Sequence, residues 1–452
     1  QVLLPRVASE TVCECPLFLP PAYPLLKEGM ECTQQINESA LADCLQQRYW
    51  YDVCKGECVF EDVHKLSTDP GFEAKIYGKI FPILVIFVIV ANILVALVLS
   101  KRHMVTPTNV VLKYMAIADL FVGLTPLPWT MFYFTFRNIE NTRMELWWCY
   151  VQKYSMDAFP PIFHNIAMWL TVLLAGQRFI SISYPMYSRS LCNVANVRIC
   201  TFVIGAISLV CGLPKSFDYN INLYDGWVIT YENQTEPHHL RTCSVTSTAI
   251  VRYLGENLFF STYYWTRALF FVAIPCTLLI GLNAGLIRGI RKAQRRKERL
   301  LREKRSRDAQ RQTDSNSTSL MLVVIVTIFT AVNLPQAIFM VIMCMEQTFY
   351  FSVLNMEHAT VFLASNNMAV MATYPINFAI YCFMSSSFRQ TFRAMFCSQC
   401  LRGEQDSAAF AERKLENSAV PLVKFMPEDH TLNTCDENSI YRRDRRNDSV
   451  FL

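Results

Sequence analysis

The sequence predicts an all-α membrane protein: a seven-transmembrane helix bundle with a short amphipathic helix after the last span. Three observations predict it: seven apolar runs of bilayer length, basic loops on one side and cysteines on the other. A crossing helix needs about twenty apolar residues, whereas barrel strands are about ten residues long and alternate in polarity. The runs are longer and do not alternate. We therefore expect helices near 77–100, 109–135, 152–182, 196–216, 258–288, 319–345 and 359–384.

The basic residues set the expected orientation. Lys101 and Arg102 follow the first run, and residues 288–311 hold twelve Lys and Arg against three acids. The positive-inside rule places these loops in the cytoplasm. We therefore expect a multi-pass protein of the plasma membrane with an extracellular N-terminus. A nucleic-acid partner is not expected, because anionic lipid headgroups account for such a basic loop and no recognition fold surrounds it.

The chain divides into four expected regions. Residues 1–76 form an extracellular Cys-rich segment, and residues 77–384 form the bundle in the lipid bilayer. Residues 385–400 form a membrane-surface helix with a candidate palmitoylation site. Residues 401–452 are charged and aperiodic, which predicts a disordered cytoplasmic tail whose serines and threonines permit phosphorylation for arrestin binding.

The membrane-surface helix is predicted from its spacing. Phe388, Phe392 and Phe396 recur every four residues, with arginines beside them. Such a helix lies on a bilayer with its aromatic face in the lipid. Cys397 and Cys400 follow directly, and membrane-adjacent cysteines are palmitoylation candidates. Two plain cytosolic thiols are the alternative.

The cysteines support the orientation. Six precede the first run, and Cys149 and Cys243 lie in other outward loops, which makes eight, an even number as disulfides require. Six cysteines allow fifteen pairings, and the sequence does not choose among them. A zinc site is disfavoured outside the cell, with only His64 nearby, so no metal site is expected there. Asn37 and Asn233 begin glycosylation sequons on outward segments.

Few ionisable residues lie inside the runs, and each is a functional candidate because charge is costly in lipid. They are Asp119, Asp157, Arg178 and Arg267, with Lys79 and Lys113 near the ends of their runs. This scarcity disfavours a pump or a coupled transporter, which needs a relay of such groups and broken-helix repeats. A channel is disfavoured because no pore-lining repeat is present.

Asn92 and Asn377 lie in the middle of their runs, as Asp119 does. None of the three can be solvated by lipid, so we expect them to pair with one another. Two interpretations stay open. The group is either a structural hydrogen-bond knot or a pocket for a sodium ion or water near Asp119.

In order along the chain, these residues resemble the marker motifs of the rhodopsin-like (class A) G-protein-coupled receptors, over roughly 77–396. The matching residues are Asn92, Asp119, Gln177-Arg178-Phe179, Pro275, Phe329, Pro335, Asn377 and Tyr381, with Cys149 and Cys243. The resemblance implies a receptor and not an enzyme, a disulfide between the two cysteines, and Arg178 at a cytosolic cleft for a heterotrimeric G protein. It also implies that the sixth helix swings about Pro335.

Several positions depart from that family pattern. Gln177 stands where an acid usually pairs with Arg178, so one restraint on the resting state is missing and basal signalling is predicted. Asn333 replaces a tryptophan, and Asn283 replaces a tyrosine. Ala167 replaces a serine that often helps to hold sodium, which weakens the sodium interpretation.

Two segments narrow the resemblance. Residues 160–178 and 374–392 closely resemble the sex-peptide/myoinhibitory-peptide receptors and the related myosuppressin receptors of invertebrates. The resemblance implies a neuropeptide receptor coupled to inhibitory G proteins. It also implies amidated peptide ligands with Arg-Phe or Trp ends.

The residues themselves also weigh the ligand classes. Pro160 stands where amine receptors carry an aspartate, and the absence of lysine from Gln347 to Arg389 excludes a retinal Schiff base. An extracellular peptide is the ligand class that remains. The candidate ligand-binding residues are Asp157, Glu256 and Glu346 for an arginine, His164, Asn333 and Gln336 for an amide, and Trp129, Phe163 and Tyr264 for stacking. Ordinary packing is the alternative for each, and a small-molecule chemosensory receptor or a seven-helix transporter or scramblase is the alternative for the whole chain.

Overall fold

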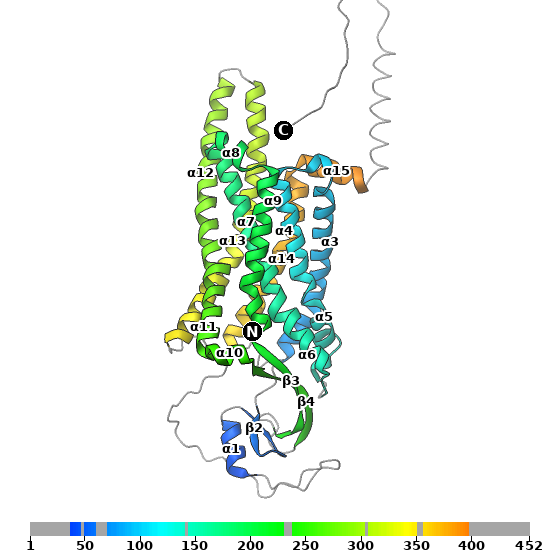
Figure 1. Ribbon diagram of the computed structural model, residues 1–452. Coiled ribbons are helices and arrows are strands. Elements are labelled where there is room, and N and C mark those ends of the chain that lie inside the picture. Colours follow the sequence, from blue (N-terminus) through cyan, green and yellow to red (C-terminus); the bar gives the residue numbers. More distant parts are fainter. Residues whose placement is uncertain are drawn as a thin grey trace, which may run out of the picture. The chain divides into compact units, whose positions relative to one another are not determined.

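The computed structural model describes residues 37–46, 49–59, 70–140, 143–229, 237–302, 306–349 and 356–396. Its main part is a bundle of long helices (Figure 1). They are α3 (Phe81–Leu99), α4 (Pro107–Leu124), α7 (Phe159–Ser183), α9 (Val194–Gly212), α12 (Ile274–Arg302), α13 (Ser306–Phe349) and α14 (Met356–Met384). Asn233, Cys397, Cys400 and the predicted tail 401–452 lie outside the described residues.

Shorter elements extend the long helices or connect them. The α-helices are α1 (Glu38–Gln46), α2 (Pro70–Lys75), α5 (Leu127–Thr130), α6 (Leu146–Gln152), α8 (Pro185–Leu191), α10 (Ala249–Leu254), α11 (Glu256–Thr266) and α15 (Ser386–Phe396). The 3-10 segments are Arg102–Met104, Asn138–Glu140 and Leu213–Ser216.

The predicted seven-helix bundle is confirmed. Six described segments are long and apolar enough to cross a membrane, and α14 makes a seventh when it is counted with α15 across a 96° bend. The six are Ile76–Leu99, Pro107–Thr135, Leu146–Ser183, Val194–Ser216, Glu256–Arg295 and Leu322–Glu346. Most ends of these segments lie within a few residues of the ends of the predicted apolar runs. Two segments are longer than predicted, because α6 extends the third at its start and α12 extends the fifth at its end.

Two of the long helices, α4 and α9, begin where the sequence supplies a capping side chain. The Thr106 hydroxyl accepts a 3.2 Å hydrogen bond from the backbone N–H of Asn109, at the start of α4. The Asn193 side chain accepts one of 2.8 Å from the backbone N–H of Asn196, at the start of α9. The first N–H groups of a helix have no partner within it, and such caps satisfy them.

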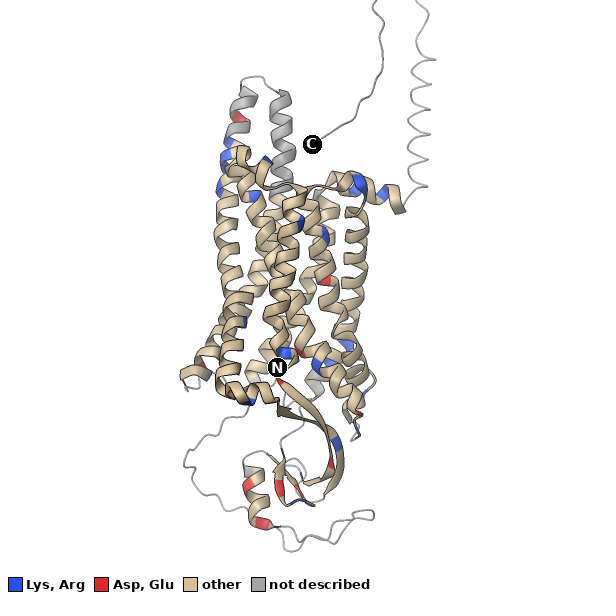
Figure 2. Ribbon diagram, viewed as in Figure 1, with Lys and Arg blue, Asp and Glu red and all other residues tan. Residues whose placement is uncertain are grey.

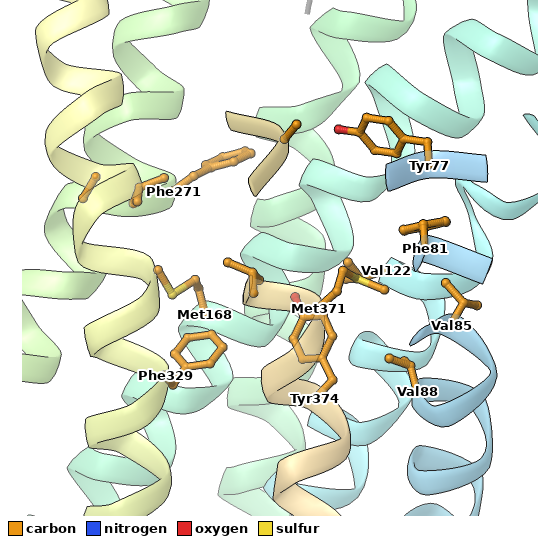
Figure 3. Close-up of a cluster of buried hydrophobic side chains, with 14 of the residues drawn as sticks. Tyr77, Phe81, Val85, Val88, Val122, Met168, Phe271, Phe329, Met371 and Tyr374 are labelled. Carbon is orange, nitrogen blue, oxygen red and sulfur yellow. The ribbon is translucent and has the colours of Figure 1, made fainter. Parts of the chain in front are cut away.

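The apolar residues separate into an inner and an outer set. Met168, Phe329 and Tyr374 belong to a buried cluster between the helices (Figure 3). On the outer side of α3, Ile86 and Phe87 remain 60% and 61% exposed. A continuous exposed apolar surface on long helices is the surface that lipid covers, so the chain is a multi-pass membrane protein.

Charged residues lie mainly toward the two ends of the bundle, with few between them (Figure 2). One end carries α8, α15 and the arginine-rich continuation of α12, and it is called the basic end here. The other carries a long β-hairpin and is called the hairpin end. The disulfide between Cys149 and Cys243 joins that hairpin to α6 at the start of the third span.

The hairpin belongs to a four-stranded sheet that the sequence analysis did not predict. Its strands are β1 (Trp50–Asp52), β2 (Glu57–Val59), β3 (Tyr219–Ile229) and β4 (His238–Ser247). They are antiparallel in the order β2-β1-β3-β4, with Tyr51 opposite Ile229 and Leu223 opposite Cys243. The sheet therefore joins the N-terminal segment to the connection between the fourth and fifth spans.

Residues 37–46 and 49–59 form a small folded head on this sheet. The disulfide Cys44–Cys58 ties α1 to β2. Leu41, Tyr51 and Ile229 are almost fully buried in one apolar cluster, which places the hairpin's own side chain in the core of the head. The head is thus held by packing as well as by strand pairing.

The amphipathic helix α15 lies against the basic ends of other helices. Phe388 is 1% exposed and contacts the ring of Tyr381, with ring centroids 5.6 Å apart. The Arg389 guanidinium donates to the backbone oxygens of Cys382 and Phe383 at 3.2 and 2.8 Å. These are final carbonyls of α14, which have no partner within the helix, so Arg389 caps it.

Candidate functional site

Four spans change from α to π geometry toward the hairpin end. The π segments are Ile76–Ile80, Met131–Thr135, Lys153–Ala158 and Arg267–Ala273. π turns are rare and frequent at functional sites. Asp157 and Arg267, two of the few ionisable residues predicted inside the spans, both lie on such segments. The hairpin end is therefore the candidate end of the bundle for a ligand site.

Asp157 lies among cations of the protein itself. Lys215 and Arg267 are both within electrostatic range of its carboxylate. Tyr264 lies near the same two cations and near Asp157. The structure thus brings together Asp157 and Tyr264, two of the candidate ligand-binding residues. A ligand cation would compete with Lys215 and Arg267 for Asp157.

The hairpin is fixed to the spans by a buried ionic junction. Asp218, 1% exposed, lies 2.8 Å from the ammonium of Lys215 and 3.2 Å from that of Lys153. Lys153 also donates a 2.6 Å hydrogen bond to the carbonyl of Tyr219, the first residue of β3. Burial raises the pKa of the Tyr219 hydroxyl, so this phenol stays neutral. Lys153, Asp157, Lys215 and Asp218 line a small cavity together.

Deeper in the bundle is a layer of polar side chains. The Nδ1 atom of His164 lies 3.0 Å from the Tyr374 hydroxyl, and Asn333 lies beside the same imidazole ring. Asn333 is fully buried and donates to the carbonyl of Phe329 at 2.8 Å. His164 Nε2 and Asn333 Oδ1 have no hydrogen-bond partner among the described residues. The Asn333 side chain is nevertheless within hydrogen-bonding influence of the His164 ring, so the two groups together are a candidate position for a polar ligand group or for water.

The next polar pair lies further toward the hairpin end of the sixth span. The Gln336 side-chain oxygen accepts a 3.3 Å hydrogen bond from Asn366 of α14. Pro335 lies inside α13 between Asn333 and Gln336, where its missing N–H removes one helix hydrogen bond. Glu346 lies nearer the end of the same span and is 8% exposed.

Two predicted stacking residues have protein neighbours instead. Trp129 is 2% exposed and stacks on Tyr133, with ring centroids 4.8 Å apart. Phe163 stacks on Phe121 at 4.9 Å. Both rings are therefore packed in this arrangement, and Trp129 has no free face for a ligand.

The predicted polar group at the middle of the bundle is partly assembled. Asp119 is 1% exposed and interacts with the side chain of Asn377. Its Oδ1 atom has no hydrogen-bond partner within the described ranges. Asn92 instead donates to the carbonyl of Val88 in its own helix, at 3.0 Å.

The basic end lacks the ion pair that the resemblance would otherwise imply. Gln177 is buried, and neither polar atom of its amide has a partner among the described residues. The Nε atom of Arg178 also has none, and no described acid acts on this guanidinium. Asn283, the other departure, donates a 2.8 Å hydrogen bond to the Thr327 hydroxyl of α13.

Apolar packing closes the same end. Leu322 and Ile325 of α13 are 0% and 2% exposed. They belong to one cluster with Met115, Leu174 and Tyr381, from the second, third and seventh spans. The sixth span therefore lies against its neighbours, and the structure is a closed state of this end.

Sequence reasoning missed some functional candidates. Tyr374 and Asn366 come from a helix in which only Asn377 and Tyr381 were singled out. Lys215 lies at the end of the fourth run and Asp218 just past it, where charged residues are ordinarily read as solvated. Two opposite charges so close to a membrane boundary were the available signal.

Comparisons with known proteins agree with this arrangement. Residues 79–399 match the family described as "Serpentine type 7TM GPCR chemoreceptor Srw". The chain is 55% identical over 400 residues to "Sex peptide receptor-related protein 2" of Caenorhabditis elegans, covering 86% of this chain and 87% of that protein. It is 33% identical to the "Sex peptide receptor" of Drosophila melanogaster, covering 79% and 82%.

A more distant relative is the "FMRFamide receptor" of Drosophila melanogaster, 21% identical over 82% of this chain and 61% of that protein. These relatives are receptors and not enzymes. The family match spans more than half of the chain, and the membrane bundle has the expected order of spans. The chain therefore belongs to the Srw family of serpentine seven-transmembrane G-protein-coupled receptors.

Proposed function

We propose that this chain is a plasma-membrane receptor that binds an extracellular peptide with an amidated C-terminus and activates heterotrimeric G proteins of the inhibitory class. The observation that carries the proposal is the 33% identity to a sex peptide receptor over 79% of the chain. The name of the FMRFamide receptor, a more distant relative, supports an amidated ligand.

The orientation follows from charge and oxidation together. The disulfides Cys44–Cys58 and Cys149–Cys243 lie at the hairpin end, and disulfides persist in oxidising compartments. Arginines gather on α12 and α15 at the opposite end, as the positive-inside rule requires of a cytoplasmic face. The hairpin end is thus proposed to be extracellular, with Asn37 of the head as an exposed glycosylation candidate.

The amide group is proposed to bind between His164 and Asn333. A primary amide has one acceptor and two donors, which complement the His164 Nε2–H and the Asn333 Oδ1. The ring carries its proton on Nε2 when Nδ1 accepts from the Tyr374 hydroxyl, across 3.0 Å. A free carboxylate has no donor for Asn333 Oδ1 and is therefore disfavoured. Gln336 is proposed to contact the penultimate part of the peptide.

Signalling is proposed to follow a two-state change. Peptide binding at the hairpin end favours a state in which α13 swings outward about Pro335. The swing removes Leu322 and Ile325 from their apolar cluster and opens a cleft at Arg178 for the G protein. Arrestin is proposed to bind the same end after phosphorylation.

The experiment uses the full-length receptor in nanodiscs with purified inhibitory G protein. Amidated peptides ending in Arg-Phe or Trp, FMRFamide among them, should stimulate nucleotide exchange, and the matched free acids should be at least tenfold less potent. Asn333→Leu should bring the potencies of the amidated peptide and its free acid closer together. This ratio of potencies does not depend on how much receptor is expressed. If Asp157→Ala and Gln336→Ala both leave peptide potency unchanged, the proposed pocket is wrong.

A second candidate function is a receptor for small chemosensory molecules. The description of the matching family as chemoreceptors favours it. A peptide library and a library of volatile and soluble metabolites, tested in the same exchange assay, separate the two. A transporter or scramblase would move substrate or lipid without G protein, which a flux assay in the same membranes detects.

A sodium ion near Asp119 remains a proposal of lower rank. The unpaired Oδ1 of Asp119 is a suitable oxygen ligand, and the neighbouring Asn377 amide supplies another. Ala167 supplies no side-chain oxygen. If sodium binds, raising its concentration at constant ionic strength should lower basal exchange in the natural chain and not in Asp119→Asn.

A further inference from the structure

The basic end is closed without an ion pair at Arg178, so another feature must hold α12 and α13 against α7. The described residues around Gln177 and Arg178 provide no polar partner for the Gln177 amide or for the guanidinium Nε. The contacts between α7 and α12 at this end are apolar and depend on glycine.

Three glycines follow each other at intervals of four residues on α12. A Cβ atom added at Gly285 would lie 2.7 Å from the Phe179 ring of α7, and one added at Gly289 would lie 2.7 Å from a methyl group of Ile182. Such distances are shorter than real Cβ contacts, so either the Phe179 and Ile182 side chains or the two helices would have to shift. A Cβ at Gly281 would meet nothing within 4 Å.

Gly285 and Gly289 therefore form a groove that receives Phe179 and Ile182. Phe179 follows Arg178 directly and Ile182 lies one helical turn after it, and both side chains pack against the buried core of the bundle. Leu286 and Ile290, which flank the glycines on α12, are 0% and 6% exposed, so this face of α12 is fully occupied. The groove sets how closely α12 approaches α7.

The position of α12 is transmitted to α13. Asn283 of α12 donates a 2.8 Å hydrogen bond to Thr327, and the two helices share an extensive contact along their length. Leu322 and Ile325 of the same α13 close the apolar cluster next to Arg178. A displacement of α12 from α7 therefore pulls α13 away from that cluster.

We infer that Gly285 and Gly289 are positioning residues that hold the receptor in its resting state, in place of the missing ion pair. This inference rests on the proposed G-protein coupling. It identifies the helix contact that opposes opening of the G-protein cleft before ligand binds. Filling the groove makes the closed packing of α12 on α7 less favourable, so it favours the open state before any ligand binds.

The test compares three identical substitutions on one helix. Gly285→Ala and Gly289→Ala should each raise basal nucleotide exchange about threefold to tenfold, since overpacking penalises only the closed arrangement. Gly281→Ala makes the same change in helix propensity at a position with free space and should leave basal exchange unchanged. Adding Phe179→Leu to Gly285→Ala removes the clashing ring and should restore the lower rate.

A second measurement does not depend on G protein. In a Leu322→Cys background, opening exposes the new thiol, and mass spectrometry reads its alkylation at that residue. Alkylation should be faster with Gly285→Ala or Gly289→Ala than with Gly281→Ala. If all three behave alike, or if both groove variants lower basal exchange and slow alkylation, the inference is overturned.

The two proposals fail in different ways. A natural chain that never stimulates G protein, combined with faster alkylation in the groove variants, would refute the coupling and support the role of the glycine groove. A natural chain that couples normally, combined with no difference between the groove variants and Gly281→Ala, would refute the role of the groove alone. The variants Gly285→Ala and Gly289→Ala are tested separately. If one of them does not reach the membrane, the other still decides between these outcomes.

Discussion

Gln177 is the residue whose surroundings differ most from those that its position in the receptor family implies. Its side-chain amide is buried beside Arg178 and has no partner among the described residues. A buried amide without partners loses its bonds to water and gains none in return, which destabilises the closed state that buries it. The missing ion pair can be predicted from the sequence alone, because it depends only on the identity of residue 177.

Restoring an acid at this position should quieten the receptor. Gln177→Glu places a carboxylate next to the Arg178 guanidinium in the closed state, and the charge-assisted bond should lower basal nucleotide exchange about threefold. Gln177→Leu removes the unpaired amide without adding a charge, so it is the matched control. An unaltered or higher basal rate with Gln177→Glu would contradict this account.

Asp218 shows the opposite situation, a buried charge with two partners. Removing a shared partner leaves the ammonium groups of Lys153 and Lys215 desolvated and poorly compensated, which typically costs about 3–5 kcal/mol. Asp218→Asn should therefore lower the thermal unfolding midpoint and reduce surface expression. Asp225→Asn, on the same hairpin, is the control, because Asp225 is 51% exposed and its contacts with His239 and Arg241 contribute little. Equal midpoints for the two variants would refute the role of the junction.

The polar layer of the candidate site was only partly predictable. His164, Asn333 and Gln336 were singled out as polar side chains able to bind the C-terminal amide of a peptide. Tyr374 was not, because a tyrosine is ordinary in a membrane helix and its partner His164 lies 210 residues away. Trp129 and Phe163 were singled out as stacking faces, and the structure packs both against other aromatic rings. Composition does not tell which side of a helix faces the site.

At the scale of elements, the four-stranded sheet is the main feature that the sequence did not reveal. β1 and β2 are three residues each, too short for an alternating pattern, and β3 and β4 were read as a loop between spans. Their register depends on contacts such as that between the Asp52 carboxylate and the Tyr224 hydroxyl, 172 residues apart. The pairing Cys44–Cys58 was one of many that the spacing allowed.

The bond between Asp52 and Tyr224 should hold the head on the hairpin. Asp52 is 1% exposed, accepts from the Tyr224 hydroxyl at 2.7 Å and also accepts from the backbone N–H groups of Cys54 and Lys55. Hydrogen bonds to charged groups contribute about 1.5–3 kcal/mol. Tyr224→Phe should therefore speed hydrogen exchange of the amides of 50–59, with no change in the membrane helices.

Tyr219→Phe is the matched control for Tyr224→Phe. Tyr219 lies on the same strand, but its hydroxyl has no hydrogen-bond partner among the described residues, so its loss should not speed exchange. Faster exchange in this control, or none in Tyr224→Phe, would contradict the role of the bond.

The same contact predicts how the head responds to pH. Burial raises the pKa of Tyr224, and the bond to Asp52 raises it further. Because the folded pKa lies above the unfolded value near 10, this stabilisation is complete below pH 10 and is lost as pH rises through the folded pKa. Exchange of the head amides, corrected for the intrinsic rate, should therefore be stable from pH 7 to 9. Tyr224→Phe should abolish the additional loss of protection above pH 10.

At the scale of the whole molecule, the spans and their order were predictable from the sequence. The bilayer requires about twenty apolar residues per helix, and this requirement is local and needs no knowledge of tertiary contacts. The packing of α12 on α7 was not predictable, because Gly281, Gly285 and Gly289 are alike in sequence and differ only in what lies opposite them.

The central claim is that a peptide at the hairpin end opens a cleft at Arg178 and thereby activates a G protein. The most direct measurement is nucleotide exchange by inhibitory G protein, with the full-length receptor in nanodiscs and an amidated peptide added on the hairpin side. The account predicts a rise of tenfold or more over the basal rate with the natural chain and no rise with Arg178→Ala. Peptide-dependent exchange that is unchanged in Arg178→Ala, or substrate flux in place of exchange, would contradict it.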